Sequence, residues 1–204
     1  MIKQGKLIIN HSSDVQPDVI NGFGNNLKEY VAEINTHSIE QKSSETTTFI
    51  SLLADSVVWA PIAVAASAFL ARIGKRAADD IWENKEKVYE LVKDSSLNPL
   101  RCLVNSIVSL LKGTPKKAHV SIGIPYPDDF FGTSLEIGTQ TELEIIQGVV
   151  TFLTNNENIK RACVEIENSE LTPLGGIFVR LNSDGKIILE WMSRDNLKKH
   201  QRVI

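Results

Sequence analysis

The sequence predicts an α+β protein with a helical N-terminal half and a C-terminal half built as a small, mainly antiparallel sheet with one packed helix. Three observations predict this class. Residues 49–73 are apolar and carry no charged side chain between positions 56 and 71. Residues 75–93 continue as an amphipathic helical pattern, so one long apolar and amphipathic helix is expected over about 49–93. The last third contains short runs of alternating apolar and polar residues, as strands do.

The first 48 residues predict a strand, a helix and a polar loop. Residues 6–10 form a short apolar run with β-branched side chains, which is typical of a buried strand. Residues 15–34 carry apolar side chains at spacings of three and four, which predicts a helix beginning near Pro17. Residues 35–48 are polar and predict a loop containing a short edge strand over 36–40.

The middle of the chain contains the clearest helix start. Asn98 followed by Pro99 supplies a cap residue and then a proline at the first helical position, while Gly113 and Pro115 end the pattern. At 113–117 the sequence pattern changes from mainly helical to a mixture of strand and helix patterns. This change predicts a mainly helical region over 1–113 and an α+β region over 114–204.

The C-terminal region predicts several strands and one helix. Strands are expected over 118–124, 134–139 and 161–167, and a helix over 141–154 in which Thr141 and Glu144 form a capping box. The turn sequence at 182–185 predicts a hairpin over 176–192. Residues 193–202 read as a short polar helix or a tail.

Composition and net charge limit the classes of function that the chain can have. Over 204 residues the net charge is −3, which argues against a nucleic-acid-binding surface spread over the whole chain, so no specific nucleic acid is expected. Cys102 and Cys163 each lie in an apolar segment and are expected to be buried free thiols. The N-terminus shows no signal-peptide pattern. A cytoplasmic location is therefore expected.

A membrane location is the alternative. The uncharged run would give about 24 Å of helix against a hydrocarbon core of about 30 Å, so it spans a bilayer only if 49–55 are added. In that reading residues 49–71 insert, the C-terminal domain stays in the cytoplasm, and the protein is associated with the inner membrane.

The loop at 125–131 is the most unusual one. Tyr126, Asp128, Asp129, Phe130 and Phe131 place two carboxylates among aromatic side chains. Rigid aromatic side chains lose little entropy on contact, so this loop is expected to bind a partner.

An enzyme is a second alternative, with a site in residues 119–131 formed by His119, Tyr126, Asp128 and Asp129. Adjacent carboxylates on an extended chain point in opposite directions, which argues against their acting together. The four histidines lie in separate segments and no paired ligand spacing occurs, so no catalytic residue, metal, cofactor or small-molecule ligand is expected.

The expected function is that of a non-enzymatic protein-interaction, regulatory or accessory module of a bacterial protein. The long helix is expected to present Val58, Trp59, Ile62 and Phe69 either to the rest of the domain or to a partner, so a protein partner or self-association is expected. The order of elements expected over 6–73, a strand, a helix and an apolar helix, resembles that of small accessory components of bacterial conflict systems. No motif accompanies this resemblance, and no residue role follows from it.

Overall fold

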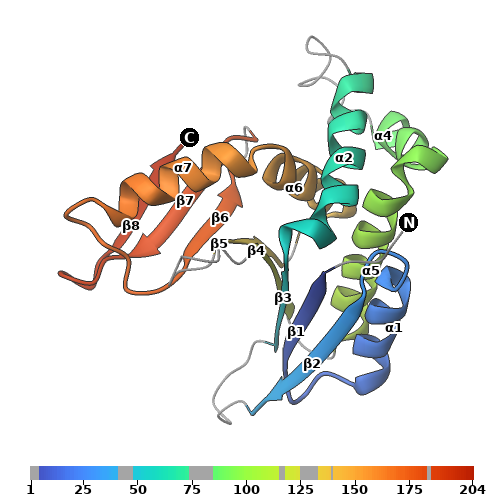
Figure 1. Cartoon of the computed structure of the whole chain (residues 1–204), viewed down its shortest axis with the longest axis horizontal. Helices are drawn as coiled ribbons and strands as arrows, with labels where there is room; N and C mark the ends of the chain where they lie inside the picture. The colour runs from blue at the N-terminus through green and yellow to red at the C-terminus, as the bar shows by residue number, and fades with distance from the viewer. Residues whose placement is uncertain are drawn as a thin grey trace.

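The computed structural model of the chain describes residues 5–40, 48–73, 85–114, 118–124, 133–138, 140–182 and 185–204. Its strands form one eight-stranded mixed sheet in the order β2-β1-β3-β4-β5-β6-β7-β8, within these described ranges (Figure 1). The strands are β1 (Lys6–Ser12), β2 (Glu33–Ile39), β3 (Thr48–Ala54), β4 (Ala118–Ile124), β5 (Thr133–Ile137), β6 (Ile177–Leu181), β7 (Ile187–Met192) and β8 (Lys199–Val203).

Parallel and antiparallel pairings alternate along most of the sheet. The pairs β1–β2, β3–β4 and β5–β6 are parallel, and helices connect the two strands of each pair. The remaining neighbours, including the β6–β7 hairpin, are antiparallel. The helices are α1 (Pro17–Leu27), α2 (Ser56–Ile73), α4 (Lys85–Val92), the 3-10 turn η1 (Ser95–Leu97), α5 (Asn98–Gly113), α6 (Glu142–Thr154) and α7 (Asn156–Glu167).

The helices cover one face of the sheet. Alternate residues of the inner strands are buried against them in one continuous core, for example Leu7 and Ile9 in β1 and Leu189 and Trp191 in β7. Residues between these, such as Ile8 in β1, are only partly buried. In Figure 1 the helices lie above and to the right of the strands. The sheet therefore has a helix-covered face and a second face, called the open face below.

The predicted layout is wrong in its central feature. Residues 49–54, expected to begin a long helix, belong to strand β3, and α2 begins only at Ser56. β1 and β4 flank β3, so its backbone groups are satisfied by strand pairing on both sides. The alternating burial of β3 fits this place, because one face of it meets the core. No long apolar helix over 49–93 is present in the described residues.

The C-terminal half is not a separate, mainly antiparallel sheet. The parallel pairing of β3 with β4 joins strands of both halves into one mixed sheet. Two helices, α6 and α7, pack on its C-terminal part instead of one. Residues 161–167, expected to be a strand, belong to α7, whose buried residues Ile159, Ala162, Cys163 and Ile166 follow helical spacing. The division into regions 1–113 and 114–204 stays a prediction.

Other predicted elements are found with different bounds. The first helix ends at Leu27, and Glu33 already begins β2, which includes all of the edge strand expected over 36–40 except residue 40. The order expected over 6–73 is wrong, because β2 and β3 lie between α1 and α2. Residues 193–202 are neither helix nor free tail, since β8 begins at Lys199. The hairpin expected over 176–192 is present as β6 and β7.

Among the described residues, none of the helices combines the length and the apolar character that crossing a bilayer requires.

Candidate interaction surface

The expected helix face is part of the protein core. Val58, Trp59, Ile62 and Phe69 are at most 2% exposed. The indole Nε1 of Trp59 donates a hydrogen bond of 3.1 Å to the carbonyl oxygen of Gly123 in β4. The chain's own helices and strands cover these side chains, so any partner must bind elsewhere.

The aromatic loop at 125–131 lies outside the described residues. The role expected for Tyr126, Asp128, Asp129, Phe130 and Phe131 therefore stays a prediction. His119 is described: it lies on the open face of β4 and is exposed.

One edge of the sheet is long and carries little charge. β2 pairs with β1 on one side, and no described strand pairs with its other side. Apart from Glu33 at its first position, this seven-residue strand contains no Asp, Glu, Lys, Arg or Pro. Its last four residues are all exposed, including Ile39 at 44%. Unpaired backbone groups along such an edge can accept another strand.

A groove runs beside this edge on the helix-covered face. It has a volume of about 490 Å³ and lies between α1 and β2. Its buried and half-buried walls include Ile20, Gly24 and Ile34, and a Cβ added at Gly24 would lie 3.5 Å from Cδ1 of Ile34. Asn21 and Lys28 are exposed at its rim. The groove offers apolar walls and polar rims to a chain lying along β2.

The other edge of the sheet is shorter and carries more charge. β8 has five residues, and its Lys199 and Arg202 form ion pairs within the chain. Lys199 Nζ lies 3.0 Å from Glu190 Oε2, and Arg202 Nη2 lies 2.6 Å from Glu165 Oε2. Short length and charged side chains are features that protect edge strands from pairing with other chains.

Polar side chains cross the middle of the open face in one row. The strand register sets His37, Asn10, Ser51, Ser121 and Glu136 side by side on β2, β1, β3, β4 and β5. Arg180 of β6 continues the row, with its Nη2 2.6 Å from Glu136 Oε2. The hydrogen bond from Arg180 to Glu136 raises the pKa of the guanidinium. The middle of the open face therefore carries a continuous row of polar side chains.

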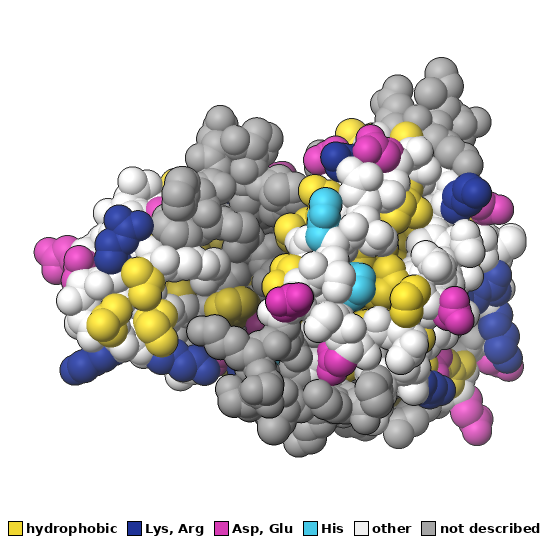
Figure 2. All heavy atoms as spheres, turned by 90° about the horizontal axis from the view of Figure 1, so that it is seen from below, with side chains coloured by type: hydrophobic (Ala, Val, Ile, Leu, Met, Phe, Trp, Pro, Cys, Tyr) yellow, Lys and Arg dark blue, Asp and Glu magenta, His cyan; other side chains and the backbone are white. Residues whose placement is uncertain are grey.

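Apolar side chains gather instead at the C-terminal end of the open face. Phe178 and Met192 are 40% and 48% exposed and lie diagonally across the β6–β7 pair. Leu174, also exposed, donates its backbone N–H to the carbonyl of Met192. Figure 2 shows hydrophobic side chains together in this part of the surface, with Lys and Arg side chains around them. Patches of this kind occur at contact sites.

The turn between β7 and β8 holds a leucine in an unfavourable conformation. Leu197 has φ of 53° and is 64% exposed. Left-handed backbone costs a non-glycine residue about 1–2 kcal/mol. Because the side chain is mostly in solvent, packing within the chain does not offset this cost.

A small cavity of about 230 Å³ lies where β5 and β6 end, beside the first turns of α6. Its charged groups are already engaged. Glu136 pairs with Arg180, and Glu144 accepts a hydrogen bond of 2.6 Å from the backbone N–H of Thr141 in the expected capping box. The volume is below the roughly 300–1,000 Å³ usual for ligand pockets, and no nucleophile with a neighbouring base lines it.

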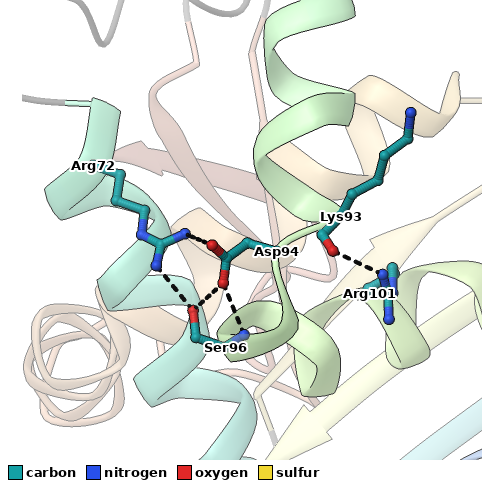
Figure 3. Close-up of polar contacts among 5 residues, drawn as sticks. All are labelled: Arg72, Lys93, Asp94, Ser96 and Arg101. Carbon is teal, nitrogen blue, oxygen red and sulfur yellow. Dashed lines mark hydrogen bonds and ion pairs between the residues drawn. The ribbon is translucent and has the colours of Figure 1, made fainter.

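A polar cluster joins the end of α2 to the segment before α5 (Figure 3). Arg72 lies 2.8 Å from Asp94, and both contact Ser96. The hydrogen bonds from Arg72 and Ser96 lower the pKa of Asp94 from an ordinary 3.8 to about 2. Figure 3 also shows Arg101 donating to the backbone carbonyl of Lys93. These contacts fix helix ends in place.

Chemistry-bearing groups are scattered through the described part of the chain. There, no three His, Cys, Asp or Glu side chains come close enough together to hold a metal ion. Comparison with known proteins adds nothing further: no family model, curated protein or solved structure matches this chain. The unprotected β2 edge with its adjoining groove is therefore the strongest candidate site. At this place the sequence predicts only a short edge strand over 36–40.

Proposed function

We propose that this chain is a non-enzymatic interaction module, of a regulatory or accessory kind, that binds an extended segment of another polypeptide along the outer edge of β2. The observation that carries the proposal is the seven-residue edge strand whose only charged side chain, apart from His37, is that of Glu33. Main-chain hydrogen bonds to such an edge supply affinity, while alternate side chains supply specificity.

The groove beside α1 supports this function. A strand added to β2 places every second side chain on the helix-covered face, where Ile20 and Ile34 offer apolar contacts. The exposed amides of Asn21 and Asn25 and the ammonium of Lys28 stand at the rim. The expected ligand is thus an extended segment with alternating apolar side chains and an acidic or polar end.

A cytoplasmic location is part of the same proposal. Cys102 and Cys163 form no disulfide with each other, and Cys163 is buried. Free thiols persist most readily in a reducing compartment.

Selection from a displayed library of random peptides tests the function. The full chain should enrich peptides that bind it, and Thr36→Lys should weaken their binding at least tenfold, because a lysine on an edge strand hinders pairing. Gln201→Lys is the matched control, since it adds the same charge at the centre of β8, and it should leave binding unchanged. Failure to enrich any peptide, or equal binding by the Thr36→Lys variant, would overturn the proposal.

A further inference from the structure

We propose that the segment bound by β2 is β2 of a second copy of this chain, paired antiparallel about a two-fold axis at Asn35. This inference rests on the proposed function and names its partner. Most homo-oligomers have closed symmetry, and a two-fold axis requires a surface that complements itself. Two elements of this edge, β2 and α1, meet that requirement separately.

The side chains of β2 match their own sequence in reverse. With Asn35 facing itself, Glu33 lies opposite the partner's His37 on the open face, where the imidazole N–H can donate to the carboxylate. On the helix-covered face, Ile34 lies opposite the partner's Thr36. No like charges face each other in this register. Opposite side chains across an antiparallel pair are close enough for such contacts to stabilise it.

The exposed side of α1 is also complementary to itself under the two-fold operation. Asp18, Asn21, Asn25 and Lys28 are all exposed and follow one another at spacings of three and four, so they lie along one side of the helix. No ion pair joins Asp18 or Lys28 to another described residue. The two-fold axis reverses α1 of the second copy, which brings the end carrying Lys28 toward the partner end carrying Asp18. Opposite charges then approach at both ends of the interface.

The same operation at the other edge gives poorer contacts. In an antiparallel β8 pair centred on Gln201, His200 lies opposite the partner's Arg202. Neither side chain has a carboxylate that could pair with the other. Lys199 would face the partner's Val203. Self-pairing is therefore expected at β2 and not at β8.

Sedimentation velocity of the full chain between about 1 and 100 µM tests the proposal. A single added strand pair is a small interface, so a reversible dimer in the micromolar range is expected. Asn35→Lys sets two cations opposite each other across the axis and should weaken the dimer at least tenfold. Gln201→Lys adds the same charge to β8 and should leave the dimer unchanged. A monomer at every concentration, or a dimer unaffected by Asn35→Lys, overturns the proposal.

A charge exchange tests the register. Glu33→Lys and His37→Glu should each weaken the dimer, since each loses the complementary contact and His37→Glu sets two carboxylates opposite each other. The double variant restores opposite charges across the pair and should recover most of the association. Within one copy, Glu33 pairs with Lys6 and accepts a hydrogen bond from Asn35. Neither contact accounts for a recovery that depends on the residue at position 37. Loss without recovery in the double variant overturns the Asn35-centred pairing.

Failure of this inference is distinguishable from failure of the proposed function. A monomeric chain whose β2 edge still binds displayed peptides keeps the function and loses the second copy as the partner. A chain that neither associates nor binds peptides loses both.

Discussion

The two edges of the sheet differ in length and in charge, although both belong to the same core. β2 is a seven-residue strand with one charged side chain at its start, apart from His37, and an open groove beside it. β8 is a five-residue strand whose Lys199 and Arg202 are tied to carboxylates of neighbouring elements. Backbone exposure alone therefore does not make a docking edge. Side chains decide which exposed edge can accept another strand.

If β2 and β8 are the two ends of one cooperative sheet, damage to the middle of the sheet at Trp59 should destabilise both edges strongly. Trp59→Ala removes a buried indole and its hydrogen bond to Gly123 at the middle of the sheet. We expect the free energy of unfolding to fall by about 3–5 kcal/mol in chemical denaturation. Hydrogen exchange should show β2 and β8 losing protection together.

Val64→Ala is the matched control on the same helix. Val64 is 69% exposed, so its truncation should change the free energy of unfolding by less than about 0.5 kcal/mol. If β2 and β8 lost protection at different denaturant concentrations in the Trp59 variant, the two edges would belong to separate units, and their comparison would lose its basis.

Removing the protection of β8 should make it behave like β2. Lys199→Thr with Arg202→Thr eliminates both charges and keeps β propensity. We expect self-association to increase about tenfold, with species beyond a dimer because each copy then has two open edges. Sedimentation velocity measures this. Lys198→Thr, in the turn before β8, is the control and should have no effect. Unchanged association of the double variant would show that charge is not what separates the edges.

The turn that leads into β8 offers a smaller effect. Leu197→Gly removes the cost of a left-handed leucine, partly offset by the greater freedom of glycine in the unfolded chain. The free energy of unfolding should rise by about 0.5–1 kcal/mol, measured by thermal or chemical denaturation. Association through β2 should stay the same, since this turn lies at the opposite edge. A destabilised variant would mean that the leucine side chain contributes packing which its 64% exposure hides.

Acid pH acts on Asp94, which lies at neither edge of the sheet, and the expected change in stability is small. The folded pKa of Asp94, about 2, lies below its ordinary 3.8, so the link to Arg72 adds stability above pH 3.8, and this contribution disappears as the pH falls toward 2. Asp94→Asn should therefore be less stable than the unchanged chain near neutral pH, and the gap should close between about pH 4 and 2. Denaturation midpoints across this range measure the gap. A gap independent of pH would contradict the assignment.

Local signals predicted several elements well. α5 is found over Asn98–Gly113, and its glycine and the proline after it indicate its end, but its N-cap is Leu97, so Asn98 lies inside the helix and is not the expected cap. Thr141 and Glu144 form the capping box of α6. These features depend on residues within one or two turns of each other, so neighbours along the chain are enough to predict them.

Elements that depend on distant partners were predicted poorly. Residues 49–54 are apolar without a decisive period, and only their pairing with β1 and β4 makes them a strand. Val31 and Ile34 fit the stripe of the first helix, yet β2 begins at Glu33 because β1 is available to pair with it. The β2 edge could not be recognised as a site from sequence, because the order of strands decides which of them lie at the margins.

The capping box of α6, the hairpin turn, the net charge and the scattering of the histidines could all be read from the sequence, because each depends on composition or on neighbours along the chain. Tertiary structure alone decided that the apolar middle segment is split into a strand and a core helix, that strands from both halves share one sheet, and that β2 and β8 end up at its margins. Strand pairing satisfies backbone hydrogen bonds between residues far apart in the chain, and no local pattern specifies which strand is left without a neighbour.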